Sequence, residues 1–106
     1  MNGVSDLHPA WTAFGAHPMR KPRGSLGAYR LRAPRTSPTD WCIEAVHGAY
    51  LGEHPYNLGG DAWRISIQRH DVDRDVFIET GFEIALSETQ AIRKVRRCAE
   101  QIGDNW

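Results

Sequence analysis

The chain has 106 residues and a mass of 12.0 kDa, which allows one domain and excludes a second independent core. Its formal net charge is zero, and no apolar run approaches the roughly 20 residues that cross a bilayer. Histidines and prolines interrupt the first twenty residues, where a signal peptide requires an apolar run. These features predict a soluble, cytoplasmic protein, in which Cys42 and Cys98 are expected to be unpaired and buried.

The zero net charge conceals blocks of opposite sign. Residues 7–39 carry six basic side chains and no acidic one, whereas residues 40–88 carry ten acidic side chains against three basic ones. The last eighteen residues have a net charge of +2. Such blocks create local fields that steer charged partners. The basic block either meets an external partner or folds back on the acidic middle and neutralises it, and the sequence leaves both interpretations open.

Residues 1–27 are predicted to form a basic N-terminal arm that is rich in proline and glycine, ahead of a single compact α+β domain over residues 28–106. No helical or alternating pattern longer than a few residues occurs in the arm. Its apolar side chains are nevertheless too many for a solvated tail, so we expect part of it to pack on the domain. These side chains are Trp11, Phe14, Met19 and Leu26.

The segment after the arm predicts a short strand and then a helix. Residues 28–33 alternate apolar and basic side chains, which is typical of a strand. Ser37 and Asp40 flank Pro38 in the pattern of a helix N-terminus, and Gly52 stands where a C-terminal cap belongs. We therefore predict a helix over residues 38–51. The competing interpretation of residues 41–47 is a strand.

The last half of the chain predicts a hairpin and a closing helix. Residues 62–69 and 75–80 alternate apolar and polar side chains on either side of a polar turn, so they are expected to pair as antiparallel strands. Ser87 and Gln90 form a second capping pattern, which is followed by an apolar stripe at helical spacing over residues 87–102. The predicted fold is thus α+β, with a small antiparallel sheet packed by two helices.

No metal, cofactor or catalytic group is predicted. Asp71, Asp73 and Asp75 alternate as in a calcium-binding loop, but Val76 replaces the glycine and Phe82 the bidentate glutamate that such a loop requires. Zinc ligands come in pairs at short spacing, and the cysteines and histidines of this chain show no such pairing. No convergent set of acid, base and nucleophile emerges, so we expect a protein that is not an enzyme.

The C-terminal half resembles two families of nucleic-acid-binding domains. The hairpin that contains residues 62–67 and 76–82, with the helix that residues 87–91 open, is similar to integrase arm-type DNA-binding domains, in which a sheet face enters the major groove. With a helix ahead of it, the order also resembles the double-stranded RNA-binding domain. Here the last helix begins Ser87-Glu88-Thr89-Gln90 instead of with lysines, so that function is not carried over. Both resemblances cover under half of the chain, and neither family is assigned.

The leading functional hypothesis is a non-enzymatic protein that binds nucleic acid or a nucleoprotein complex through its basic arm. Arginine dominates this block, and its guanidinium group recognises phosphate and stacks on bases. Gly24 to Gly27, flanked by arginines, form a further candidate for close backbone approach to phosphate. The alternative is an interaction module or inhibitor, of phage or mobile-element type, that presents its acidic middle to a basic protein. The predicted contacts are Arg20, Lys21, Arg23, Arg30, Arg32, Arg35, Arg93, Lys94 and Arg97.

Overall fold

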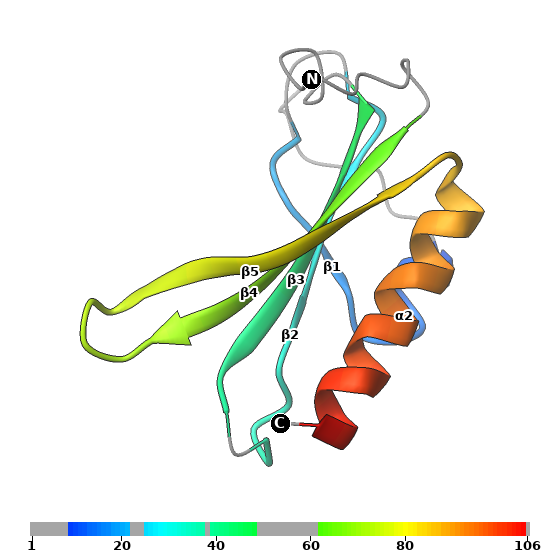
Figure 1. The fold of residues 1–106 in the computed structure, drawn as a ribbon. Helices are drawn as coiled ribbons and strands as arrows, with labels where there is room; N and C mark the ends of the chain where they lie inside the picture. Colours follow the sequence, from blue (N-terminus) through cyan, green and yellow to red (C-terminus); the bar gives the residue numbers. More distant parts are fainter. Residues whose placement is uncertain (1–8, 22–24, 38, 49–61, 106) are drawn as a thin grey trace.

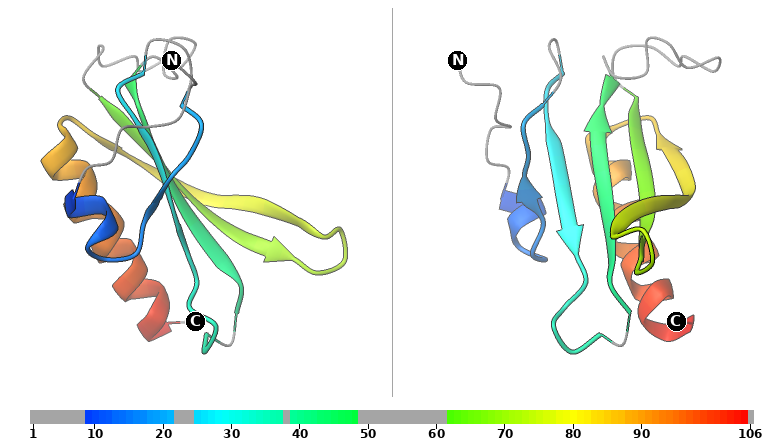
Figure 2. Two further views of the ribbon diagram at one scale, coloured as in Figure 1. Left: turned by 180° about the vertical axis from the view of Figure 1, so that it is seen from behind. Right: turned by 90° about the vertical axis from the view of Figure 1, so that its left-hand side faces the viewer.

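A computed structural model describes residues 9–21, 25–37, 39–48 and 62–105, in which five antiparallel strands form one sheet with helices on one side (Figures 1 and 2). The strands are neighbours in space in the same order as in the chain, so the sheet is a simple meander. In chain order the elements are α1 (Pro9–Thr12), β1 (His17–Pro18), β2 (Ala28–Arg32), β3 (Trp41–His47), β4 (Trp63–Asp71), β5 (Val76–Ala85) and α2 (Glu88–Asn105). The α+β class is therefore confirmed.

The predicted helix over residues 38–51 is wrong, because Trp41–His47 form β3 at the centre of the sheet. Residues 38 and 49–51 lie outside the described part. Ser37 does not cap a helix: its Oγ bonds the backbone of Thr39 and closes a turn into the strand. Most residues of β3 are buried, including Cys42 on the face away from α2, so the apolar run is nearly continuous and satisfies a helical stripe equally well.

The hairpin of β4 and β5 is confirmed and is longer than predicted. Its turn uses Asp75 at φ 55°, a left-handed conformation that Asp tolerates better than most residues. Asp71 Oδ1 accepts hydrogen bonds from the backbone N–H groups of Asp73 and Arg74 at 3.0 and 3.4 Å, so the acidic run organises this turn. The register shifts between Ile67 and Gln68, where β5 contains an extra residue.

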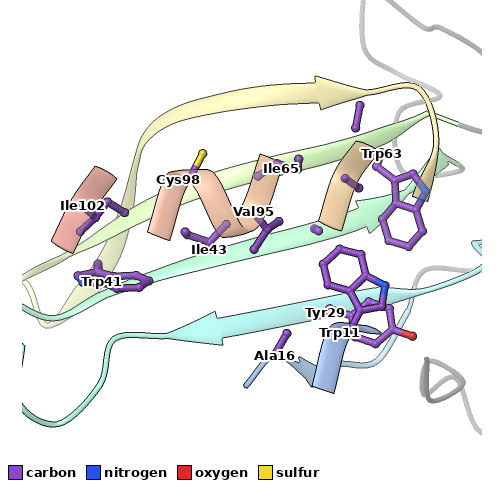
Figure 3. Close-up of a cluster of buried hydrophobic side chains, with 13 residues drawn as sticks. Trp11, Ala16, Tyr29, Trp41, Ile43, Trp63, Ile65, Val95, Cys98 and Ile102 are labelled. Atoms are coloured by element: carbon purple, nitrogen blue, oxygen red, sulfur yellow. The ribbon is translucent and has the colours of Figure 1, made fainter. Parts of the chain in front are cut away.

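The core lies between the sheet and the two helices (Figure 3). Trp63 and Ile65 from β4 and Ile43 from β3 meet the stripe of α2 that includes Val95 and Cys98. The closing helix predicted over residues 87–102 is confirmed as α2, and its capping pattern is present: Ser87 Oγ accepts from the Gln90 backbone N–H at 3.1 Å. The strand predicted over residues 28–33 is confirmed as β2.

The second helix of the fold comes from the N-terminal segment. The short helix α1 places Trp11 in the core with no exposed surface, stacked on Tyr29 at a centroid distance of 4.5 Å. Figure 2 shows α1 and α2 on the same side of the sheet. Strand β1 then pairs with β2 at the sheet edge. Residues 9–18 therefore pack on the domain, as expected for part of the predicted arm.

Candidate functional site

The face of the sheet that points away from α2 carries most of the polar chemistry, and we call it the open face. Side chains alternate along a strand, so Tyr29 and Leu31 of β2 point to the core while Arg30 and Arg32 point to the open face. The strand register extends the core-facing row and the open-face row of side chains across β3, β4 and β5. The open-face residues of β3, β4 and β5 are Cys42, Glu44, Val46, Arg64, Ser66, Gln68, His70, Phe77, Glu79, Phe82 and Ile84.

A hydrogen-bonded network crosses four strands of this face. Arg30 on β2 pairs with Glu44 on β3 through Nε at 2.8 Å and through Nη2. Gln68 on β4 donates to Glu44 at 3.0 Å and to Ser66 at 3.1 Å, and Ser66 donates to Glu79 on β5 at 2.6 Å. The network holds these side chains in fixed orientations.

Arg64 completes the network at its far end. Its two terminal nitrogens bind both carboxylate oxygens of Glu79, at 2.7 and 2.9 Å, in the planar geometry that guanidinium and carboxylate share. The hydrogen bonds from Arg64 lower the pKa of Glu79, those from Ser66 add to this effect, and partial burial opposes it. Glu79 is therefore held as an anion whose charge is compensated within the chain.

Two arginine–phenylalanine contacts lie on the same face. The Arg32 guanidinium lies 4.9 Å from the ring centroid of Phe77, and that of Arg64 lies 4.6 Å from the ring centroid of Phe82. Phe82 is 46% exposed although it is a large apolar residue. The face is hollowed beside one member of each contact, Arg64 and Phe77, with a volume of about 450 Å³ that extends to Met19 and Arg20.

The nine predicted contact residues do not form one continuous surface. Arg20, Arg30 and Arg32 belong to the open face or its border, and Lys21 follows Arg20 directly. Arg35 is exposed in the β2–β3 loop. The remaining described residues, Arg93, Lys94 and Arg97, lie on α2, and Arg23 lies outside the described residues.

Four of these residues contact carboxylates of the same chain. Besides Arg30 with Glu44, Arg32 contacts Asp40 at 3.4 Å. Lys94 and Arg97 both contact Glu83, at 3.7 and 3.1 Å. Neutralisation of the basic block by the acidic middle is therefore observed for Arg30 and Arg32, and the acidic middle also pairs with two basic residues of α2. Among the residues that the structure describes, no ion pair involves Arg20, Lys21, Arg35 or Arg93.

The acidic middle is neutralised as well. Eight of its ten acidic residues are described, and six of these contact a basic or histidine side chain. Glu88 accepts a hydrogen bond from Trp11. Glu53 and Asp61 lie outside the described residues. Basic and acidic residues that are separate in the sequence thus form ion pairs between strands and between α2 and the sheet.

Three residues of the surface were not among the predicted contacts: Arg64, Phe77 and Phe82. Arg64 could have been found from the sequence, because Arg64, Ser66 and Gln68 alternate with apolar residues and therefore form one polar face of a strand. The sequence could not predict that Phe77 and Phe82 share a face. Strict alternation would place residues five apart on opposite faces, and the extra residue in β5 brings them to the same one.

The described residues of the glycine segment, 25–27, have structural roles, and Gly24 lies outside the described residues. The N–H of Gly27 is bonded to Ser25 Oγ and that of Leu26 to His47 Nδ1, at 3.2 and 3.0 Å, so these amides already have partners. In the described part of the chain, no three His, Cys, Asp or Glu side chains are grouped to hold a metal ion. Burial raises the pKa of Cys42 to about 11, and both cysteines are unpaired and buried.

No family model, curated protein or solved structure matches the chain. None of the helices formed by the described residues has the length and apolarity that crossing a membrane requires.

Proposed function

We propose that the protein is a non-enzymatic nucleic-acid-binding protein that holds a single strand across its open face. The observation that carries this proposal is the pair of arginine–phenylalanine contacts, Arg32 with Phe77 and Arg64 with Phe82, placed on one hollowed sheet face. Planar aromatic and guanidinium groups are the surfaces on which unpaired bases stack. A strand laid across β2 to β5 would meet both contacts.

The shape and chemistry of the face favour a single strand over a duplex. A hollow accommodates a flexible strand with unstacked bases, whereas the rigid duplex accepts a protruding helix or ribbon in its groove. Phe82 offers exposed ring surface, and the Phe77 ring lies under Arg32. Such stacking tolerates any base, because every base has a π-face.

The carboxylates within the network do not remove the arginines from this role. Arg64 binds Glu79 through the edge of its guanidinium group, and Arg30 binds Glu44 in the same way. Edge-on bonding leaves the flat faces of the group for stacking. Phosphate contacts are assigned to Arg20 and Lys21 at the β1 border, where no carboxylate of the described residues pairs with them.

The alternative of an acidic surface that recognises a basic protein has less support. Six of the eight described acids in the middle block are already in contact with basic or histidine side chains. Asp73, in the exposed β4–β5 turn, is a described acid of this block without such a contact. Recognition through carboxylates would first have to break the network.

The experiment is fluorescence anisotropy with a labelled twelve-nucleotide oligothymidylate and the corresponding duplex. We expect the single strand to bind, with an affinity that falls with log salt at a slope of about −0.7 per phosphate contact. Phe82→Ala should weaken binding by about 1–3 kcal/mol, the range for one stacked base. Val72→Ala, which truncates an 80% exposed side chain in the hairpin turn, should leave binding unchanged.

A pair of charge variants locates the surface. Arg20→Ala with Lys21→Ala should reduce both the affinity and the salt slope, whereas Arg93→Ala, on α2 at the other side of the sheet, should change neither. Absence of single-strand binding, equal loss in Arg93→Ala, or preference for the duplex would overturn the proposal. Capture of a basic protein that survives nuclease treatment, without oligonucleotide binding, would favour the acidic-surface alternative.

A further inference from the structure

The two edges of the sheet are protected very differently. The β1 edge consists of two residues, and one of them is Pro18, which has no N–H to donate. The β5 edge is ten residues long and contains no proline. Within the described residues no strand pairs with its outer side, and Figure 1 shows the β4–β5 hairpin projecting away from α2. Natural sheets rarely leave such an edge without a cover or a charged guard.

The side chains along β5 do not guard the edge. Val76 is 48% exposed and Ile78 is 38% exposed, although both are apolar and of high β propensity. The two charged residues of the strand are neutralised inside the chain, Glu79 by Arg64 and Glu83 by Lys94 and Arg97. A second strand would therefore meet apolar side chains and compensated charges, without the repulsion that normally prevents edge pairing.

From this asymmetry we infer that a second copy of the chain covers the β5 edge, so that two sheets join through antiparallel β5 strands. Of the two sheet edges that the described residues form, only the β5 edge is able to pair, because β1 is short and carries Pro18. Pairing of β5 with β1 of the next molecule, which would give open-ended chains, is thereby disfavoured. Pairing of β5 with itself closes after two copies about a two-fold axis.

This arrangement is independent of the proposed binding role. The side chains of Val76 and Ile78 precede the bulge at Thr80 and lie on the side of the sheet opposite to Phe77 and Glu79. Joining two β5 edges keeps the open faces of both copies accessible, since backbone pairing extends the sheet in its own plane. Failure of dimer formation would therefore leave the nucleic-acid proposal standing, and the reverse also holds.

The test is sedimentation velocity of the full chain without nucleic acid over a range of concentrations. We expect a species of about 24 kDa, twice the chain mass of 12.0 kDa, that dissociates on dilution. Val76→Lys with Ile78→Lys should shift the dissociation constant at least tenfold towards monomer. Val72→Lys places the same charge at a more exposed apolar residue outside the strand and should leave the dimer unchanged.

A measurement on the natural chain tests the inference even if the lysine variant does not fold. Backbone amides of Val76–Ala85 should exchange with deuterium more slowly at high than at low protein concentration, while those of β3 should not depend on concentration. A chain that is monomeric at all concentrations, a dimer that persists in the lysine variant, or open-ended polymers would each overturn the inference. The inference would also be overturned if the β5 amides became protected only when a different protein is added.

Discussion

Trp11 and Glu88 are joined by a hydrogen bond of 2.8 Å from the indole Nε1 to the carboxylate Oε2, although they lie 77 residues apart in the chain. The bond links the N-terminal segment to the first turn of α2. Glu88 also lies where a negative charge is favourable to a helix. Because Trp11 stacks on Tyr29 and has no exposed surface, this segment is part of the core.

Substitution of Trp11 should therefore destabilise the whole domain. Trp11→Ala removes a fully buried aromatic side chain and is expected to lower the free energy of unfolding by about 3–5 kcal/mol in urea denaturation. Trp11→Phe should cost less, since it keeps a ring and loses the donor to Glu88. Thr12→Ala, exposed in the same helix, is the control. An unchanged free energy in Trp11→Ala would show that the segment does not belong to the core.

The assignment of residues 41–47 as a central strand gives a second prediction. Ile43 is 1% exposed in β3, so Ile43→Ala should cost about 2–5 kcal/mol of unfolding free energy. Ile78 is 38% exposed at the edge, and the same substitution there should cost much less when measured at concentrations where the chain is monomeric. Equal losses at the two positions would contradict the placement of β3 in the interior.

The lowered pKa of Glu79 predicts a pH-dependent contribution to stability. A carboxyl group whose pKa is lower in the folded than in the unfolded chain stabilises the fold above its ordinary value of 4.5. That contribution disappears as the pH falls through the lowered value, where the folded chain also takes up the proton. The difference in unfolding free energy between the natural chain and Glu79→Gln should therefore be largest near neutral pH and decline in acid.

The partner of Glu79 supplies the control for this experiment. In an Arg64→Gln background, the Glu79→Gln substitution should lose most of its pH dependence, because the two hydrogen bonds from Arg64 are the largest cause of the lowered pKa. Chemical denaturation of the four chains at a series of pH values gives the coupling directly. The same pH dependence with and without Arg64 would contradict the assigned cause.

The two cysteines should be unreactive in the folded chain. Burial raises the pKa of the Cys42 and Cys98 thiols to about 11, and a hydrogen bond to Glu83 contributes at Cys98. Since the thiolate is the reactive form, Ellman's reagent at pH 8 should modify neither residue quickly, and both should react after unfolding. Val72→Cys, at an exposed site, should react at once and serves as the positive control. Rapid labelling of both natural thiols in the folded chain would be incompatible with their burial.

Local patterns were sufficient for the elements at which propensity, periodicity and end signals agree. The alternation in residues 62–69 and 75–80 predicted the β4–β5 hairpin, and Ser87 with Gln90 predicted the start of α2. The same kind of signal failed at Ser37 to Asp40, because serine and proline serve a tight turn before a strand as well as a helix N-terminus. Residues 41–47 form a strand because they pair with β2 on one side and β4 on the other.

The sequence likewise predicted only part of the candidate surface. The composition of the sequence determined that this chain carries arginine-rich and acidic blocks, and strand periodicity determined that Arg30 and Arg32 share one face of β2. Only the tertiary structure decided that Arg30 meets Glu44 and that Arg64 meets Glu79, and that these pairs lie beside Phe77 and Phe82. The physical reason is that periodicity is a local property of the backbone, whereas the choice of ionic and aromatic partners depends on strand order and register, which arise from packing between distant segments.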